Sequence, residues 1–200
     1  MATELNQLKR SLLYSEELGI ALNQRREQEY FKWFVASLLF GGRISETIAK
    51  NTYRTFARYH LLTPRRIVNA GWEFLVDPIM REGGYVRYDG RKSEQILRDC
   101  QVLLDRYRGK LTELHDRSNN SRDLEDKLLE FYGVGPITVN IFLRELRPYW
   151  KHADPSPLPR VTEVAARLAL DLDTVRRKTV SFTRIEAGII RLRKRRNLSV

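Results

Sequence analysis

Two helical runs of apolar residues meet at a connection that contains little except glycine. Residues 128–146 read LLEFYGVGPITVNIFLREL, and apolar side chains recur at about every third or fourth position on both sides of Gly-Val-Gly. A connection this short needs a sharply bent backbone that approaches its neighbours closely, which glycine permits and other residues resist. Gly133 and Gly135 therefore predict two helices that meet in a tight hairpin.

The same hairpin has the backbone groups that bind phosphate. The first amides of the helix that starts PITVNIF have no partner within that helix, and they lie at the positive end of its dipole. A hairpin made of Gly133, Val134, Gly135 and Thr138 is thus predicted to hold a DNA backbone without reading bases. A purely structural turn is the alternative, because a Gly-x-Gly connection alone is a weak motif.

The charge of the chain favours a nucleic-acid partner. Its net charge is +11 and its pI is about 10.0, which is typical of proteins that meet nucleic acid or an anionic membrane surface. The basic residues are 27 Arg and 9 Lys, and the planar guanidinium group suits phosphate. The basic segment RLRKRRNLSV, residues 191–200, is either a phosphate-binding helix end or a solvated tail.

The cysteine and histidine content excludes several kinds of site. Cys100 is the single cysteine, so disulfides within the chain and zinc or iron–sulfur sites built from several thiolates are excluded. The three histidines have no metal-ligand spacing. The N-terminal residues have neither the pattern of a signal peptide nor that of a membrane span. We therefore expect a soluble intracellular protein, cytoplasmic or associated with the nucleoid.

Helical periodicity recurs along the whole chain, and no segment reads as a strand. Ser45, the pair Thr63-Pro64, and Ser121 are predicted to begin three of the helices as caps. The proline-rich stretch RPYWKHADPSPLPR, residues 147–160, is predicted to be irregular. We therefore predict an all-α fold. The predicted helices cover residues 26–40, 46–60, 65–75, 90–109, 122–131, 136–146, 161–170, 173–182 and 183–197.

Three stretches carry a resemblance to a known superfamily. They are FKWFVASLLFGGRIS at 31–45, GGYVRYDGRKSEQI at 83–96, and the hairpin LLEFYGVGPITVNIFL at 128–143. In this order and spacing they resemble the helix-hairpin-helix superfamily of base-excision DNA glycosylases, which includes endonuclease III and the mismatch-specific thymine glycosylases. The resemblance covers roughly residues 28–170, and only the hairpin is specific by itself.

The resemblance implies an architecture and a partner. It implies a six-helix lobe over residues 28–146 with the hairpin, and a second helical lobe from residues 1–27 and 147–200. A cleft between the lobes would take a base swung out of the duplex. The implied partner is double-stranded DNA with a lesion or mismatch, bound by a monomer and without a membrane.

Two further places follow from the resemblance. The wedge loop would be residues 41–44, in which Arg43 or Ile44 would fill the gap that the extruded base leaves. Arg43 could equally be a solvated or phosphate-facing arginine. Tyr85 and Tyr88 would line the base pocket, or would simply be core aromatics.

The catalytic positions depart from the pattern of the superfamily. Bifunctional members have a lysine where this chain has Ile137, so a Schiff-base lyase step at that position is not available. The usual aspartate position falls on Leu158, and the nearest carboxylate is Asp154. We predict monofunctional hydrolysis with Asp154 stabilising the oxocarbenium-like sugar. The alternative role of Asp154 is to start a turn before Pro155.

The resemblance also implies a cation site, and two other functions remain open. Backbone carbonyls of Leu129, Phe131 and Val134 would hold Na⁺ or K⁺, and no iron–sulfur cluster is expected. One alternative function is a glycosylase-like protein that binds damaged or bent DNA without chemistry. The other is a helical RNA-binding protein that shares only the hairpin.

Overall fold

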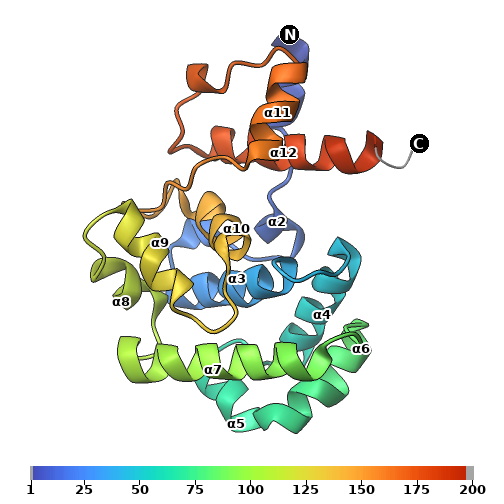
Figure 1. Cartoon of the computed structure of the whole chain (residues 1–200), viewed down its shortest axis with the longest axis vertical. Helices are drawn as coiled ribbons and strands as arrows, with labels where there is room; N and C mark the ends of the chain where they lie inside the picture. Colours follow the sequence, from blue (N-terminus) through green and yellow to red (C-terminus); the bar gives the residue numbers. More distant parts are fainter. Residues whose placement is uncertain (1, 197–200) are drawn as a thin grey trace.

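The computed structural model describes residues 2–196, and all regular structure within them is helical (Figure 1). This confirms the predicted all-α fold. The elements are α1 (Ala2–Lys9), α2 (Tyr14–Glu17), the short 3₁₀ helix η1 (Leu22–Gln24), α3 (Glu27–Phe40), α4 (Glu46–Arg58), α5 (Pro64–Phe74), the π-type turn η2 (Leu75–Met80), α6 (Arg81–Gly83), α7 (Asp89–Tyr107), α8 (Leu111–Asp116), α9 (Ser121–Leu129), α10 (Pro136–Leu146), α11 (Pro159–Arg167), the 3₁₀ helix η3 (Leu172–Thr174) and α12 (Val180–Arg196).

The helices pack around two hydrophobic clusters. The larger cluster spans α2 to α10 and includes the fully buried side chains of Trp33, Phe34 and Phe142. It also takes in Leu13 and Ile20, from the segment that the resemblance assigns to the second lobe. A smaller cluster joins α1, α11 and α12. These three helices lie together at one end of the molecule, and α5 and α7 lie at the other (Figure 1).

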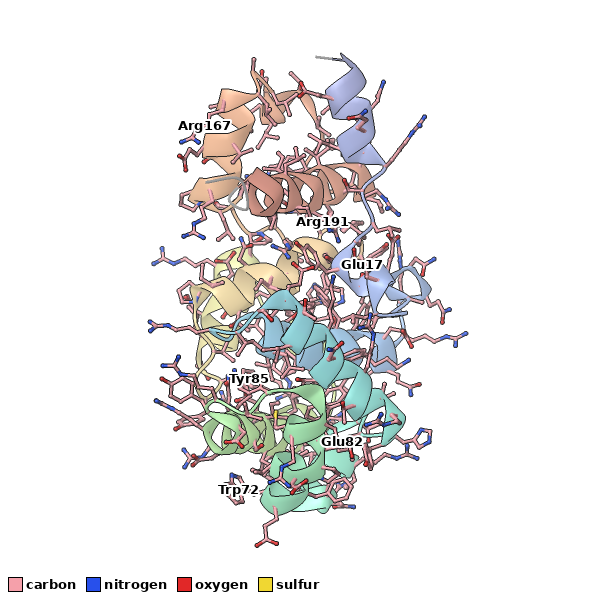
Figure 2. All side chains as sticks on the ribbon, turned by 90° about the vertical axis from the view of Figure 1, so that its right-hand side faces the viewer. Glu17, Trp72, Glu82, Tyr85, Arg167 and Arg191 are labelled. Atoms are coloured by element: carbon pink, nitrogen blue, oxygen red, sulfur yellow. The ribbon has the colours of Figure 1, made fainter. Side chains whose placement is uncertain are left out.

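A buried glutamate and a partly buried ion pair connect α2 to α10 and α12. Glu145 in α10 is fully buried, and its two carboxylate oxygens accept hydrogen bonds from the amides of Tyr14 and Ser15 at 2.9 and 3.0 Å. These amides begin α2, so the carboxylate caps that helix. Arg191 in α12 pairs with Glu17 in α2 at 2.9 Å, and Figure 2 shows the two side chains between the ends.

The helix starts follow the sequence signals with one correction. Ser45 caps α4 by accepting from the amide of Ile48, and Thr63 caps α5 before Pro64, as predicted. Ser121 was predicted to cap the next helix, but it is the first residue of α9 and the cap is Asn120. The Asn120 side chain accepts from the amide of Asp123 at 3.0 Å, and asparagine caps helices as well as serine does.

The C-terminal part of the chain differs from the prediction over residues 173–179. Within the predicted helix 173–182, the regular structure is limited to the end of η3 and the start of α12 at Val180, and α12 then runs across the predicted boundary with the helix 183–197. Thr179 sets this start, because its hydroxyl accepts from the amide of Phe182 at 3.2 Å. In the same segment, the guanidinium of Arg177 donates a hydrogen bond to the carboxylate of Asp154. The stretch 147–158 contains no helix, as its prolines predict.

One close approach fixes the packing of α4 against α6. Gly83 is buried, and a Cβ atom at this position would lie 2.4 Å from the Cα of Thr52. Only glycine lets the two backbones come this close.

Cys100 is buried in the larger cluster, and this burial raises the pKa of its thiol well above the ordinary value. None of the described helices has the length and apolar character to cross a membrane.

Candidate nucleic-acid interface

The hairpin between α9 and α10 has the geometry that its glycines predict. Gly133 has φ of +67°, the left-handed region that glycine adopts without strain. Gly135 is the N-cap of α10, and Pro136 follows at the first helical position. Between the two glycines, Val134 is 8 % exposed and belongs to the larger core. The valine therefore anchors the hairpin while both glycines stay at the surface.

The face of the hairpin in front of Gly135 is open. A Cβ atom at Gly135 would meet no heavy atom within 4 Å. No side chain caps α10, and its first backbone bond runs from the amide of Val139 to the carbonyl of Gly135. The amides of Ile137 and Thr138 come before that bond, at the positive end of the helix dipole. An approaching phosphate can therefore reach them across a glycine.

The other side of the hairpin packs on a polar stripe of α7. A Cβ atom at Gly133 would lie 3.2 Å from the Gln95 side chain, and Gln95 accepts a hydrogen bond from Lys92 at 2.6 Å. Lys92 also donates to the carbonyl of Leu38 at 3.0 Å. One turn further along α7, Asp99 is fully buried, with the backbone amide of Tyr132 and the side chain of Gln95 beside its carboxylate. The residues of α7 that lie beneath the hairpin thus include two titratable side chains, Lys92 and Asp99.

Asp99→Asn is expected to stabilise the protein more at pH 8 than at pH 5. Burial raises the pKa of Asp99 to about 8, although the nearby Tyr132 amide and Lys92 lower it. Between the ordinary carboxyl pKa of about 4 and this value, the folded state binds more protons than the unfolded state. Stability therefore falls as the pH rises through this window, and asparagine removes that loss.

Thermal unfolding of both proteins at the two pH values measures this effect. Relieving a penalty of about 1 kcal/mol corresponds to a rise in Tm of about 2–4 °C for a domain of this size. The nearby variant Lys92→Met is the control, because burial lowers the pKa of Lys92 to about 8, so its penalty is largest at low pH. A gain for Asp99→Asn that did not depend on pH would show that the carboxylate does not titrate in this range.

The predicted wedge loop lies directly against the start of α10. A Cβ atom at Gly41 would lie 2.0 Å from the hydroxyl oxygen of Thr138, and one at Gly42 would lie 2.9 Å from that of Tyr85. Thr138 and Tyr85 are 6 % and 3 % exposed. The wedge loop therefore packs on the start of α10 through Gly41 and on Tyr85 through Gly42, and Arg43 extends from the loop as an exposed side chain.

The two predicted pocket tyrosines have different environments. Tyr85 belongs to the larger core, and burial raises the pKa of its hydroxyl. Tyr88 is 56 % exposed, and the guanidinium of Arg87 lies 5.0 Å from its ring centroid. Neither lines the cavity described next.

A cavity of about 370 Å³ lies where α10 faces α11 and α12. Both positions at which the chain departs from the superfamily, Ile137 and Leu158, line it. Leu158 is also the N-cap of α11 and gives no side-chain hydrogen bond. No aspartate or glutamate is among the lining residues of the part of the chain that is described. Those residues are Tyr14, Phe40, Ile137, Ile141, Arg144, Leu158, Arg160, Val161, Val164, Ile189 and Ile190.

Asp154 is close in sequence to Leu158, which lines the cavity, but the Asp154 carboxylate is bound by two arginines. One of its carboxylate oxygens lies 3.3 Å from Nε of Arg147 and 3.1 Å from the guanidinium of Arg177. The Asp154 side chain is 31 % exposed. Arg147 has no exposed side-chain surface and also pairs with Glu186 in α12. The described geometry therefore ties this carboxylate into a structural ion-pair network.

The backbone carbonyls predicted to hold a cation lie around the hairpin. The carbonyl of Phe131 accepts from the amide of Val134 at 3.2 Å, while Leu129 ends α9. Among residues whose side chains are described, no group of three or more His, Cys, Asp or Glu could hold a metal ion. The predicted monovalent site uses main-chain oxygens alone and stays a prediction.

The basic segment 191–200 lies mostly outside the residues with described side chains.

Arg144 is the residue of this region that the sequence analysis missed. It lies on α10 in the apolar row Ile137, Ile141 and Arg144, at spacings of four and three residues, and it lines the cavity. An arginine within an apolar helical row was the available signal, because such a row faces the interior.

Comparisons with known proteins give one match. Over 113 residues the chain is 31 % identical to the protein named Endonuclease III of Buchnera aphidicola subsp. Baizongia pistaciae (strain Bp). The match covers 56 % of this chain and 45 % of that protein, so the chain spans less than half of its relative's length. No family model matches, and no solved structure gives a significant match. The chain is therefore similar to endonuclease III, a member of the superfamily that its three sequence stretches resemble.

Proposed function

We propose that this protein acts in DNA base-excision repair, and that it binds double-stranded DNA at a lesion or mismatch. The hairpin from Phe131 to Thr138 holds the DNA backbone, and the wedge loop beside it enters the duplex. The observation that carries the proposal is the open, uncapped start of α10 in front of Gly135. The similarity to endonuclease III and the net charge of +11 support it independently.

The binding step has stronger geometric support than the chemical step. Hydrolysis of a glycosidic bond passes through a cationic sugar, which a nearby carboxylate stabilises and a nearby cation destabilises. The cavity beside the hairpin is lined by Arg144 and Arg160 and by no carboxylate of the described chain. The geometry therefore favours binding of damaged DNA without hydrolysis at this cavity.

A monofunctional glycosylase is the second candidate function. It is favoured by Asp154, which retains 31 % of its side-chain exposure on the linker that joins α10 to α11. In this case the carboxylate would leave Arg147 or Arg177 when DNA binds. Loss of base release in Asp154→Asn, with binding retained, would support this role.

A panel of labelled duplexes separates the two candidates. Each duplex carries one lesion, mismatch or abasic site, and binding is measured by fluorescence anisotropy while base release is measured by alkaline strand cleavage. Preference for damaged duplex over undamaged duplex and structured RNA is the expected result. A preference for structured RNA would overturn the proposal, and release of free base would establish the second candidate.

Gly135→Leu is expected to weaken binding to every duplex by about tenfold or more. The new side chain would cover the amides at the start of α10, and backbone contacts carry no base information. The fold should be retained, because φ of −111° suits any residue and a Cβ meets no atom within 4 Å.

Gly135→Ala is the matched control for this test. Its methyl group adds little bulk, so binding should fall by less than with leucine, and Tm should stay close to that of the original protein. A loss restricted to one DNA sequence would contradict a contact with the backbone.

A further inference from the structure

Arg144 is a buried cation that forms no ion pair with a described side chain. Its side chain belongs to a residue that is 5 % exposed, and Nε has no hydrogen-bond partner. No ion pair or side-chain hydrogen bond joins this guanidinium to another of the residues 4–192, whose side chains are described. Its one described contact is with the ring of Tyr14, 5.3 Å from the centroid.

No neighbouring carboxylate forms an ion pair with Arg144, although the charge of Arg144 lowers the pKa of the adjacent Glu145, which burial raises. Glu145 is the adjacent residue, but both of its oxygens are used by the amides of Tyr14 and Ser15. Arg191 lies over the same tyrosine ring at 4.3 Å, and unlike Arg144 it has a carboxylate partner in Glu17. The hydroxyl of Thr183 donates to the backbone carbonyl of Arg144 and so fixes its main chain against α12.

An unpaired buried charge is costly, and a ligand can remove that cost. A buried charge that has lost its water and gained no ion-pair partner destabilises the folded protein. Arg144 lines the cavity, so an anion that entered could meet the guanidinium directly. Arginine binds phosphate and carboxylate through paired N–H donors, which gives stronger bonds than neutral groups do.

The rest of the cavity indicates what the anion is attached to. Arg160 lines it from α11 as an exposed second cation, and no partner is described for it. The walls are mainly apolar, from aliphatic residues such as Ile141 and Val161 and from the aromatic residues Tyr14 and Phe40. A volume of about 370 Å³ is in the range of small-molecule sites. Two arginines and apolar walls suit a phosphate group carried by a flat, mainly apolar body.

We propose that this cavity is a binding site for a nucleotide phosphate, with Arg144 as the buried contact and Arg160 as the outer one. The phosphate belongs either to a free mononucleotide or to the end of a DNA strand, and the chemistry is the same in both. This site is separate from the DNA-backbone contact at Gly135.

Calorimetric titration with deoxyadenosine 5′-monophosphate and with deoxyadenosine tests the proposal, because the two ligands differ only in the phosphate. The unchanged protein should bind the monophosphate at least tenfold more tightly. Arg144→Met should abolish that preference and Arg160→Gln should reduce it. Gly135→Leu should not change the preference for the monophosphate over the nucleoside. The outcome of this titration is therefore independent of the proposed function.

The source of the phosphate is decided by nicked duplexes that end in a 5′-phosphate or a 5′-hydroxyl. A phosphate preference seen only with the nicked duplex assigns the site to DNA ends, and one seen only with the monophosphate assigns it to free nucleotides. The proposal is overturned if phosphate gives no preference in either pair, or if Arg144→Met keeps the preference.

Thermal unfolding without ligand distinguishes binding from a structural role. Removing an unpaired buried charge should leave the Tm of Arg144→Met unchanged or raise it. A marked fall in Tm would show that Arg144 holds the fold together and would contradict its assignment as a vacant anion contact.

Discussion

Replacing Arg147 by methionine is expected to lower the free energy of unfolding by about 3–5 kcal/mol, because it leaves a buried carboxylate without its partner. The Arg147 side chain has no exposed surface, and its guanidinium pairs with Glu186, which is 1 % exposed. It also contacts Asp154 and packs over the ring of Phe182 at 5.0 Å. One side chain therefore joins α10, the proline-rich linker and α12.

Arg177→Met is the matched control for this prediction. It removes a guanidinium from the same Asp154 carboxylate, but the Arg177 side chain is 38 % exposed. Exposed pairs contribute about 0–1 kcal/mol, so the loss should be much smaller. Chemical denaturation measures both variants. Adding Glu186→Leu to Arg147→Met should recover part of the stability, and equal losses for the two arginines would show that burial does not set the cost.

Gly83→Ala is expected to lower the free energy of unfolding by about 1–3 kcal/mol through overpacking. The added methyl group would lie 2.4 Å from the Cα and 2.5 Å from the hydroxyl oxygen of Thr52. Relief requires the backbone of α4 to move away from α6, because a rotamer change cannot shift a Cα atom.

Two further variants check this steric explanation by the same denaturation measurement. Gly135→Ala adds a methyl group where no atom lies within 4 Å, and it should cost far less. Thr52→Ala should not rescue Gly83→Ala, since the closest contact is to the backbone. Full rescue would mean that the threonine side chain, and not the main chain, creates the crowding.

Local signals in the sequence were sufficient for most of the helices. Ser45 and Thr63-Pro64 were identified because capping depends on the few residues around a helix start. Ser121 was misassigned by one position, since Asn120 offers an equally good cap and the sequence does not rank them. The helix expected over 173–182 does not form at its start, where Arg177 contacts Asp154, a residue far away in the chain.

The candidate site was only partly accessible to such reasoning. The two glycines predicted the hairpin, because their need for an unusual backbone is local. The close contact between Gly41 and Thr138, and the ion pairs of Asp154, join residues far apart in the chain. The apolar row around Arg144 indicates a side chain that faces the interior, but only the packing of α10 against α11 and α12 places that side chain at a cavity.

The buried thiol of Cys100 makes the protein well suited to site-specific labelling. It is the single cysteine of the chain, it is 1 % exposed, and its raised pKa keeps it in the unreactive protonated form. A cysteine introduced at an exposed position would thus carry a fluorophore or spin label without removal of the native one. Distances between such a label and a marked duplex would then report the orientation of the protein on DNA.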